Sequence, residues 1–150
     1  MLVLLALLGC SRTDTRDKTI AVSSDDAEMN AAIATARSKL PEFWKTFDKP
    51  GQGEKDFSLK VKITDDNGTE YFWVIPVEKK GGKIYGTINN DPDIVKSVKL
   101  GQRIEVREDA VADWLFMRNG KMVGNYTLRP LLKQMPTEEA DKLKAMMESP

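Results

Sequence analysis

The chain has 150 residues, enough for one domain with a sizeable core and too few for two. Its 23 Lys and Arg equal its 23 Asp and Glu, which disfavours a general nucleic-acid binder, since that class needs a basic surface. With no His and one Cys, it has no Ser-His or Cys-His nucleophile pair, no His-ligated metal and no internal disulfide. The sequence therefore predicts neither a cofactor nor a metal site.

The first ten residues form an apolar run that ends at the single cysteine, Cys10. The run is too short to span a bilayer, but it matches the apolar segment of a signal peptide. Its end, Leu7-Leu8-Gly9-Cys10, resembles a bacterial lipobox, although Leu8 is bulkier than the Ala, Ser or Thr usual there. We predict a lipoprotein signal peptide over residues 1–10 with Cys10 as the lipidated residue. The alternative is a buried first strand or helix that contains a core cysteine.

The segment after Cys10 is polar and lacks sustained periodicity up to residue 24. We interpret residues 11–24 as a flexible tether and residues 25–150 as a single folded domain. Ser11 rather than Asp follows Cys10, which is typical of an outer-membrane address if the envelope is Gram-negative. The expected localisation is the bacterial cell envelope, with the domain facing the periplasm and held to the membrane by its lipid.

Helical periodicity begins near residue 25. Asp25 and Glu28 have the spacing of a capping box, and apolar residues recur at three- and four-residue steps from Met29 to Leu40. Pro41 predicts a break there. A short second helix follows, and its aromatic side chains are expected to belong to the core: Phe43, Trp44 and Phe47.

The middle of the chain predicts antiparallel strands. Residues 57–64 alternate between apolar and polar, and the following Asn67-Gly68 suits the positive φ of a hairpin turn. Residues 70–78 predict a strand covered on both faces, with a bulge or an edge at Pro76. A third strand covers residues 83–88 and completes a three-stranded meander.

Later segments complete an α+β domain. A strand near residues 103–106 precedes a hairpin with Asn119-Gly120 at its turn, and a last helix starts near Thr137, the expected cap. The prediction is a small curved antiparallel sheet of about five to six strands, flanked by an N-terminal helix pair and a C-terminal helix.

The loop that begins at Asn89 is the first stretch that could carry chemistry. The first, third and fifth positions of a calcium-loop pattern are filled by Asn89, Asp91 and Asp93. The sixth and twelfth positions are Ile94 and Leu100, where the pattern requires Gly and a bidentate Glu. A calcium loop of that kind is excluded. We expect instead an Asx turn that starts a short helix over residues 93–98.

The hairpin over residues 113–132 has the highest density of large side chains. We expect its aromatic residues to close the sheet, Gly124 to leave room for a close neighbour, and Asp113 to pair with Arg129. If the protein has a binding site, five residues are the candidates for it: Asn90, Asp91, Trp114, Tyr126 and Arg129.

Several segments resemble the YegJ-like family of bacterial domains of unknown function. They are residues 40–44, residues 56–61, Thr87-Ile88-Asn89-Asn90-Asp91-Pro92, and the span from Asp113-Trp114 to Arg129. The resemblance covers roughly residues 25–133. It implies a predicted envelope lipoprotein or an add-on domain, and it supplies no catalytic residue or cofactor. A similar signature among suspected toxin-immunity proteins is an analogy.

Three functions remain to be weighed. The first is a non-enzymatic envelope lipoprotein whose domain binds a protein or a cell-wall component. The second is an immunity-like protein that neutralises a toxin, although its balanced charge does not suggest an anti-nuclease role. The third is a hydrolase with paired carboxylates among Asp91, Asp93 and Asp113, which would not need His. We favour the first.

Overall fold

The computed structural model describes residues 26–149. Cys10, the predicted signal peptide and tether, and the predicted cap Asp25 lie outside the described residues. The described chain forms an α+β domain, as predicted, with an open six-stranded antiparallel sheet in the order β4-β3-β2-β1-β5-β6. The strands are β1 Glu54–Asp65, β2 Gly68–Lys80, β3 Lys83–Ile88, β4 Arg103–Val106, β5 Val111–Arg118 and β6 Lys121–Gly124.

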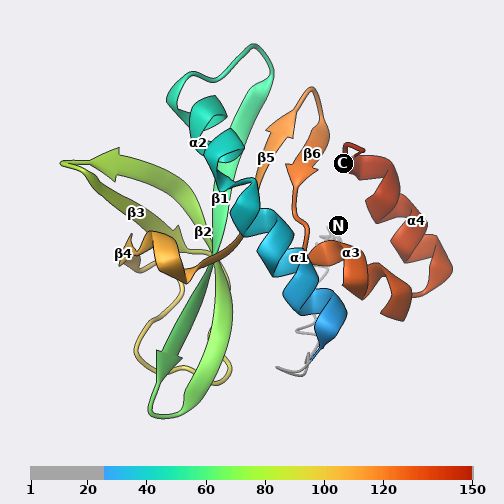
Figure 1. Ribbon diagram of the computed structural model, residues 1–150. Coiled ribbons are helices and arrows are strands. Elements are labelled where there is room, and N and C mark those ends of the chain that lie inside the picture. Colours follow the sequence, from blue (N-terminus) through green and yellow to red (C-terminus); the bar gives the residue numbers. More distant parts are fainter. Residues whose placement is uncertain (1–25, 150) are drawn as a thin grey trace, which may run out of the picture.

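Helices precede and follow the sheet. They are α1 Ala27–Ser38, α2 Leu40–Asp48, α3 Leu128–Leu131 and α4 Thr137–Met146, with 3-10 turns η1 Glu108–Ala110 and η2 Leu132–Gln134. Figure 1 shows α1 lying across the sheet near β5, whereas α3 and α4 stand beside the β6 end. Both helices of the N-terminal pair contact β5, so they cover the sheet beside the β5–β6 hairpin.

The boundary between α1 and α2 follows from two local features. Asp26 is the observed N-cap of α1, because its Oδ1 accepts a hydrogen bond from the Met29 amide at 3.0 Å. The predicted cap was thus one residue too early. The chain breaks at Lys39 so that Pro41 enters the first turn of α2, where its missing N–H costs nothing.

The core is aromatic and lies between the helix pair and β1, β2 and β5. Phe43, Phe72, Trp114 and Phe116 are at most 2% exposed, and Leu59 packs among them. The core assignment of Phe43, Trp44 and Phe47 is confirmed, although Trp44 and Phe47 are only partly buried. The Trp114 indole Nε1 donates to the Ala36 carbonyl at 2.8 Å, which ties α1 to β5.

The strand β2 is not covered on both faces, which corrects the prediction. Phe72 and Val74 are fully buried, whereas Tyr71 on the other face is 38% exposed. The predicted irregularity at Pro76 is confirmed, because the pairing register with β3 shifts between Val74 and Val77. The extra residue reverses the alternation, so Val77 joins the core face although it had been expected on the side of Tyr71.

The predicted helix over residues 93–98 is absent, and the segment is a loop. The Glu70 carboxylate accepts hydrogen bonds at 3.0–3.2 Å from the backbone amides of Asp93, Ile94 and Val95. Asp65 does the same for Lys96 and Ser97 at 2.7 and 2.9 Å. These acids on β1 and β2 satisfy the backbone amides of the loop, so the segment needs no helical hydrogen bonds.

Two predicted local signals, one for a hairpin turn and one for a helix start, also need correction. The predicted hairpin between β1 and β2 is confirmed, with Asp66 and Asn67 between the paired Asp65 and Gly68, but Asn67 does not adopt positive φ. Thr137 is the first residue of α4 and makes no capping hydrogen bond, since Pro136 occupies the cap position. The Asn119-Gly120 turn is confirmed, with φ of 50° and 79°.

Candidate functional site

Asp113 holds the exit from β6 in place. It is fully buried, and its carboxylate accepts hydrogen bonds from the Trp114, Tyr126 and Thr127 amides and from the Thr127 hydroxyl, at 2.7–3.2 Å. Burial raises the pKa of the Asp113 carboxyl, and the hydrogen bonds from Thr127, Trp114 and Tyr126 oppose that rise. The predicted ion pair with Arg129 is wrong, because within residues 26–149 these donors hold the carboxylate and Arg129 faces elsewhere.

A left-handed turn brings Tyr126 and Thr127 to Asp113. Gly124 and Asn125 have φ of 85° and 51°, and the Asn125 amide donates to the Trp114 carbonyl at 2.8 Å. A Cβ on Gly124 would lie 2.4 Å from that carbonyl oxygen, so the expected close neighbour of Gly124 is Trp114. The Asp-Trp pair and the following Gly-x-Tyr-Thr segment therefore form one structural unit.

A groove lies where this unit meets the helix pair. We call it the β5–β6 groove, and its volume is about 160 Å³. Its lining comes from α2 and the residue before it, from both strands of the hairpin, from the segment after β6 and from the end of the chain: Lys39, Glu42, Thr46, Trp114, Phe116, Arg118, Val123, Gly124, Tyr126, Arg129, Glu148 and Ser149.

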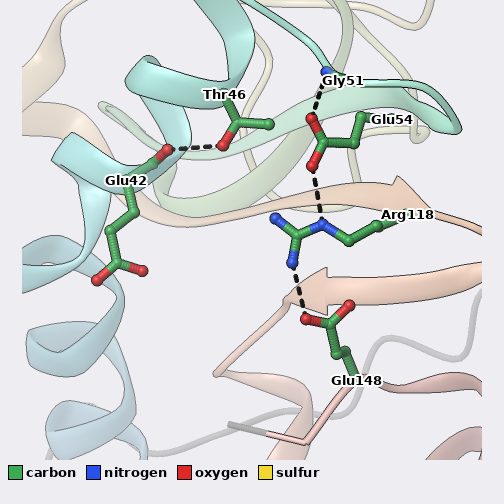
Figure 2. Close-up of polar contacts among 6 residues, drawn as sticks. All are labelled: Glu42, Thr46, Gly51, Glu54, Arg118 and Glu148. Atoms are coloured by element: carbon green, nitrogen blue, oxygen red, sulfur yellow. Dashed lines mark hydrogen bonds and ion pairs between the residues drawn. The ribbon is translucent and has the colours of Figure 1, made fainter.

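Arg118 is neutralised at one end of the groove. Figure 2 shows its guanidinium between two acids: Nε donates to Glu54 at 2.8 Å and Nη1 donates to Glu148 at 2.8 Å. The backbone amide of Gly51, together with Arg118, holds the pKa of Glu54 below its usual value. The acids in turn raise the pKa of Arg118. These residues form a structural ion-pair network that joins β1, β5 and the end of the chain.

Arg129 and Lys39 place two further cations around Tyr126. The Arg129 guanidinium carbon lies 5.7 Å from the centre of the Tyr126 ring, and the Lys39 Nζ lies 5.8 Å from it. Arg129 Nη2 makes one long hydrogen bond, 3.5 Å, to the Glu148 carbonyl, and its buried Nε has no hydrogen-bond partner among the described residues. An unpaired buried donor costs about 1–3 kcal/mol, so an acceptor that reached Arg129 Nε would recover that free energy.

The structure brings together three of the five predicted site residues. Trp114, Tyr126 and Arg129 line the β5–β6 groove, whereas Asn90 and Asp91 lie in the loop after β3 and are absent from its lining. The Asn90 Oδ1 accepts a hydrogen bond from the Trp73 amide at 2.9 Å, which fastens that loop to β2. Asp91 is exposed.

A second depression lies on the other side of α2. Its volume is about 330 Å³, and Arg37, Trp44 and Asp109 contribute to its lining. Arg37 donates to the carbonyls of Asp109 and Val111, and the Asp109 carboxylate accepts from Arg107, so Arg37 and Asp109 are engaged. The β5–β6 groove is the better candidate, because Lys39 and Arg129 converge there and its unsatisfied buried donor belongs to a cation, whereas in the second depression the unsatisfied donor is the neutral Trp44 indole.

Several groove residues are missing from the sequence prediction. Lys39, Glu42 and Thr46 recur at helical spacing, which is a detectable signal that they share one face. Glu148 carries no such signal. It reaches the groove because Met147 forms a parallel bridge with Met122 and the Glu148 amide donates to the Met122 carbonyl at 2.8 Å.

Two features of the described residues concern metal binding and membrane crossing. Within residues 26–149, no cluster of three or more potential ligand side chains is placed to hold a metal ion. None of the helices in that same part of the chain is long and apolar enough to cross a membrane.

The fold and the groove define a small α+β domain whose open antiparallel sheet carries a charged groove at the β5–β6 end. The chain belongs to a family of uncharacterised proteins conserved in bacteria (DUF2314), whose family model matches residues 26–147. The matched range includes Asp113, the β6 exit and Arg129, so the family domain contains most of the groove.

Two relatives extend the comparison. The chain is 35% identical over 147 residues to the uncharacterized protein YegJ of Escherichia coli (strain K12), covering 98% of this chain and 95% of YegJ. It is 29% identical over 126 residues to the putative ankyrin repeat protein NMB1133/NMB1171 of Neisseria meningitidis serogroup B (strain ATCC BAA-335 / MC58). That match covers 79% of this chain and 50% of the relative. No solved structure matches the chain.

Proposed function

We propose that this protein is an envelope lipoprotein whose domain is a non-enzymatic binding module, with the β5–β6 groove as its ligand site. One observation carries the proposal: Trp114, Tyr126 and Arg129 line the same groove, and Arg129 brings to it a buried donor without a partner. Convergent polar groups in a concave site with aromatic walls are typical of ligand binding.

The carboxylates of the protein support binding over hydrolysis. A glycosidase needs two carboxyl groups that face each other across the substrate. Asp113 is buried under four hydrogen bonds, Asp91 is outside the groove, and of the two groove acids, Glu42 and Glu148, the second is paired with Arg118. An immunity-like function is a special case of the same proposal in which the ligand is a toxin.

The membrane anchor rests on Leu7-Leu8-Gly9-Cys10, the lipobox-like end of the apolar run. We predict that Cys10→Ala moves the protein from the membrane fraction to the soluble fraction, because the residue that would carry the lipid is lost. The measurement is fractionation of cells followed by immunoblotting, with Ser11→Ala as the matched control. Unchanged fractionation of Cys10→Ala would contradict the anchor.

Binding is tested by chemical crosslinking of the full chain in living cells. The wild-type protein is expected to yield a discrete adduct, and Arg129→Gln is expected to lose it because the groove loses the cation that carries the unsatisfied donor. Arg103→Gln is the matched control, since Arg103 binds Glu78 through Nε and Nη2 on β4, away from the groove. An adduct retained in Arg129→Gln would contradict the groove as the binding site.

A further inference from the structure

We propose that the β5–β6 groove recognises a peptide through a single carboxylate group, which binds the Nε–Nη2 edge of Arg129 beside Lys39. The inference rests on the proposed binding function and specifies the chemistry of the ligand. It follows from the hydrogen bonds that Arg129 lacks, from the charges around the groove and from the way in which the chain's own end occupies its rim.

The Nε and Nη2 atoms of an arginine donate side by side and match the two oxygens of a carboxylate. In Arg103 the same two atoms both bind Glu78 Oε2, at 3.1 and 2.8 Å. In Arg129 the corresponding edge holds one 3.5 Å hydrogen bond at Nη2 and none at Nε. A ligand carboxylate that enters this edge in place of the Glu148 carbonyl would satisfy both donors, and the ring of Tyr126 against the guanidinium would hold the fork in place.

The charges at the groove favour a monoanion. Arg118 is already neutralised by Glu54 and Glu148, so Lys39 and Arg129 are the cations that remain for a ligand. Glu42 and Glu148 also line the groove, and they repel a dianion such as phosphate more strongly than a carboxylate. Figure 2 shows Glu42 on α2 with its carboxylate directed away from Thr46.

Glu148, near the end of the chain, already supplies oxygens to the two arginines of the groove, Arg118 and Arg129. The Glu148 carboxylate binds Arg118, and the Glu148 carbonyl accepts the long hydrogen bond from Arg129 Nη2. This segment pairs in parallel with β6 through Met122 and so already occupies part of that sheet edge. An extended peptide that takes the place of this segment is therefore the kind of ligand whose backbone and carboxylate fit this rim, in the manner of strand addition to a sheet edge.

The test follows the Nε–H signal of Arg129 by NMR in the ¹⁵N-labelled full chain, assigned through its loss in Arg129→Gln. The probes are N-acetylated trialanine with a free carboxylate, the same peptide with a C-terminal amide, an amidated acetyl-Ala-Glu-Ala peptide, and inorganic phosphate. We expect a saturable shift with a free carboxylate and none with the amidated trialanine. A shift with the free C-terminus alone assigns the ligand to chain ends, whereas a shift with both carboxylate peptides assigns it to any exposed carboxylate.

Variants make the test independent of folding defects. Arg129→Lys keeps the charge but removes the fork, and it is expected to weaken binding by about tenfold. Because this variant lacks the Arg129 Nε–H signal, its binding is followed through the backbone amide signals of other groove residues. Arg103→Gln is expected to leave binding unchanged. Glu148→Gln removes a competing negative charge and is expected to tighten binding. Four outcomes would each overturn the proposal. They are weaker binding in Glu148→Gln, no shift with either carboxylate peptide, an equal shift with the amidated trialanine, and tighter binding of phosphate than of the carboxylate peptides.

Failure of this proposal is distinguishable from failure of the binding function. If living cells give an adduct that depends on Arg129 but the carboxylate peptides cause no shift, the ligand chemistry is wrong and the binding function stands. If the peptides bind but no adduct forms in cells, the ligand chemistry stands and the cellular binding function fails.

Discussion

Asp113 is the residue on which the geometry of the β6 exit depends most. Its carboxylate gathers three backbone amides and the Thr127 hydroxyl in a fully buried position. We predict that Asp113→Asn destabilises the domain by about 3 kcal/mol, because an amide NH₂ replaces an acceptor and hydrogen bonds to a charged group are lost. The measurement is urea unfolding.

Asp109→Asn is the control for that experiment. Asp109 is exposed and paired with Arg107, and such surface pairs contribute about 0–1 kcal/mol. Equal destabilisation by the two variants would contradict the structural role assigned to Asp113.

Asp65 gives the clearest dependence on pH. The Asn67 amide, with those of Lys96 and Ser97, lowers the pKa of Asp65 from 3.8 to about 2. A depressed pKa stabilises the fold above the unfolded value and loses that contribution as the pH falls through the folded value. We therefore predict that Asp65→Asn lowers the Tm at neutral pH and that the difference from wild type narrows between pH 3.8 and about 2. A constant difference across that range would contradict this account.

At the scale of elements, the β5–β6 hairpin is set by its two glycines. Gly120 in the turn has φ of 79° and open space around its Cβ position, whereas Gly124 has φ of 85° and faces the Trp114 carbonyl. We predict that Gly120→Ala costs about 1–2 kcal/mol from backbone conformation alone. Gly124→Ala is expected to cost distinctly more, since Trp114 must also move, and thermal unfolding would measure both. Equal losses would indicate that the close approach is unimportant.

The hairpins were predictable because local signals specify them. Asn119-Gly120 marks its turn, Pro76 marks the register shift, and the aromatic residues of α2 fall on one helical face. The residues 93–98 were mispredicted because their local helix-start signal is overridden by distant acids, Glu70 and Asp65. Such a contact between strand and loop has no signature in a short window of sequence.

The groove was predictable only in part, because several of its contacts join segments that are distant in the sequence. The sequence predicts Trp114, Tyr126 and Arg129 together because they share one dense hairpin. The predicted partner of Arg129 was wrong because sequence proximity to Asp113 does not reveal that backbone amides fill its carboxylate. Glu148 enters through packing of α4 and the pairing of Met147 with β6, which depends on the tertiary fold.

At the scale of the whole molecule, the sheet has two different ends. The β4 end bears exposed ion pairs such as Lys83 with Glu105 and Arg103 with Glu78. The β6 end is instead covered by α3, α4 and the end of the chain, and it holds the groove beside α2 (Figure 1). Under our proposal, this second end of the sheet is the one that meets a partner.

Site-specific photo-crosslinking in living cells tests the central claim most directly. A photoreactive amino acid would replace Thr46 in the groove and, as a control, Lys80 at the exposed end of β2. The account predicts an adduct from position 46 that disappears when Arg129→Gln is added, and none from position 80. Adducts of equal yield from both positions, or an adduct at position 46 that persists without Arg129, would contradict the groove as the binding site.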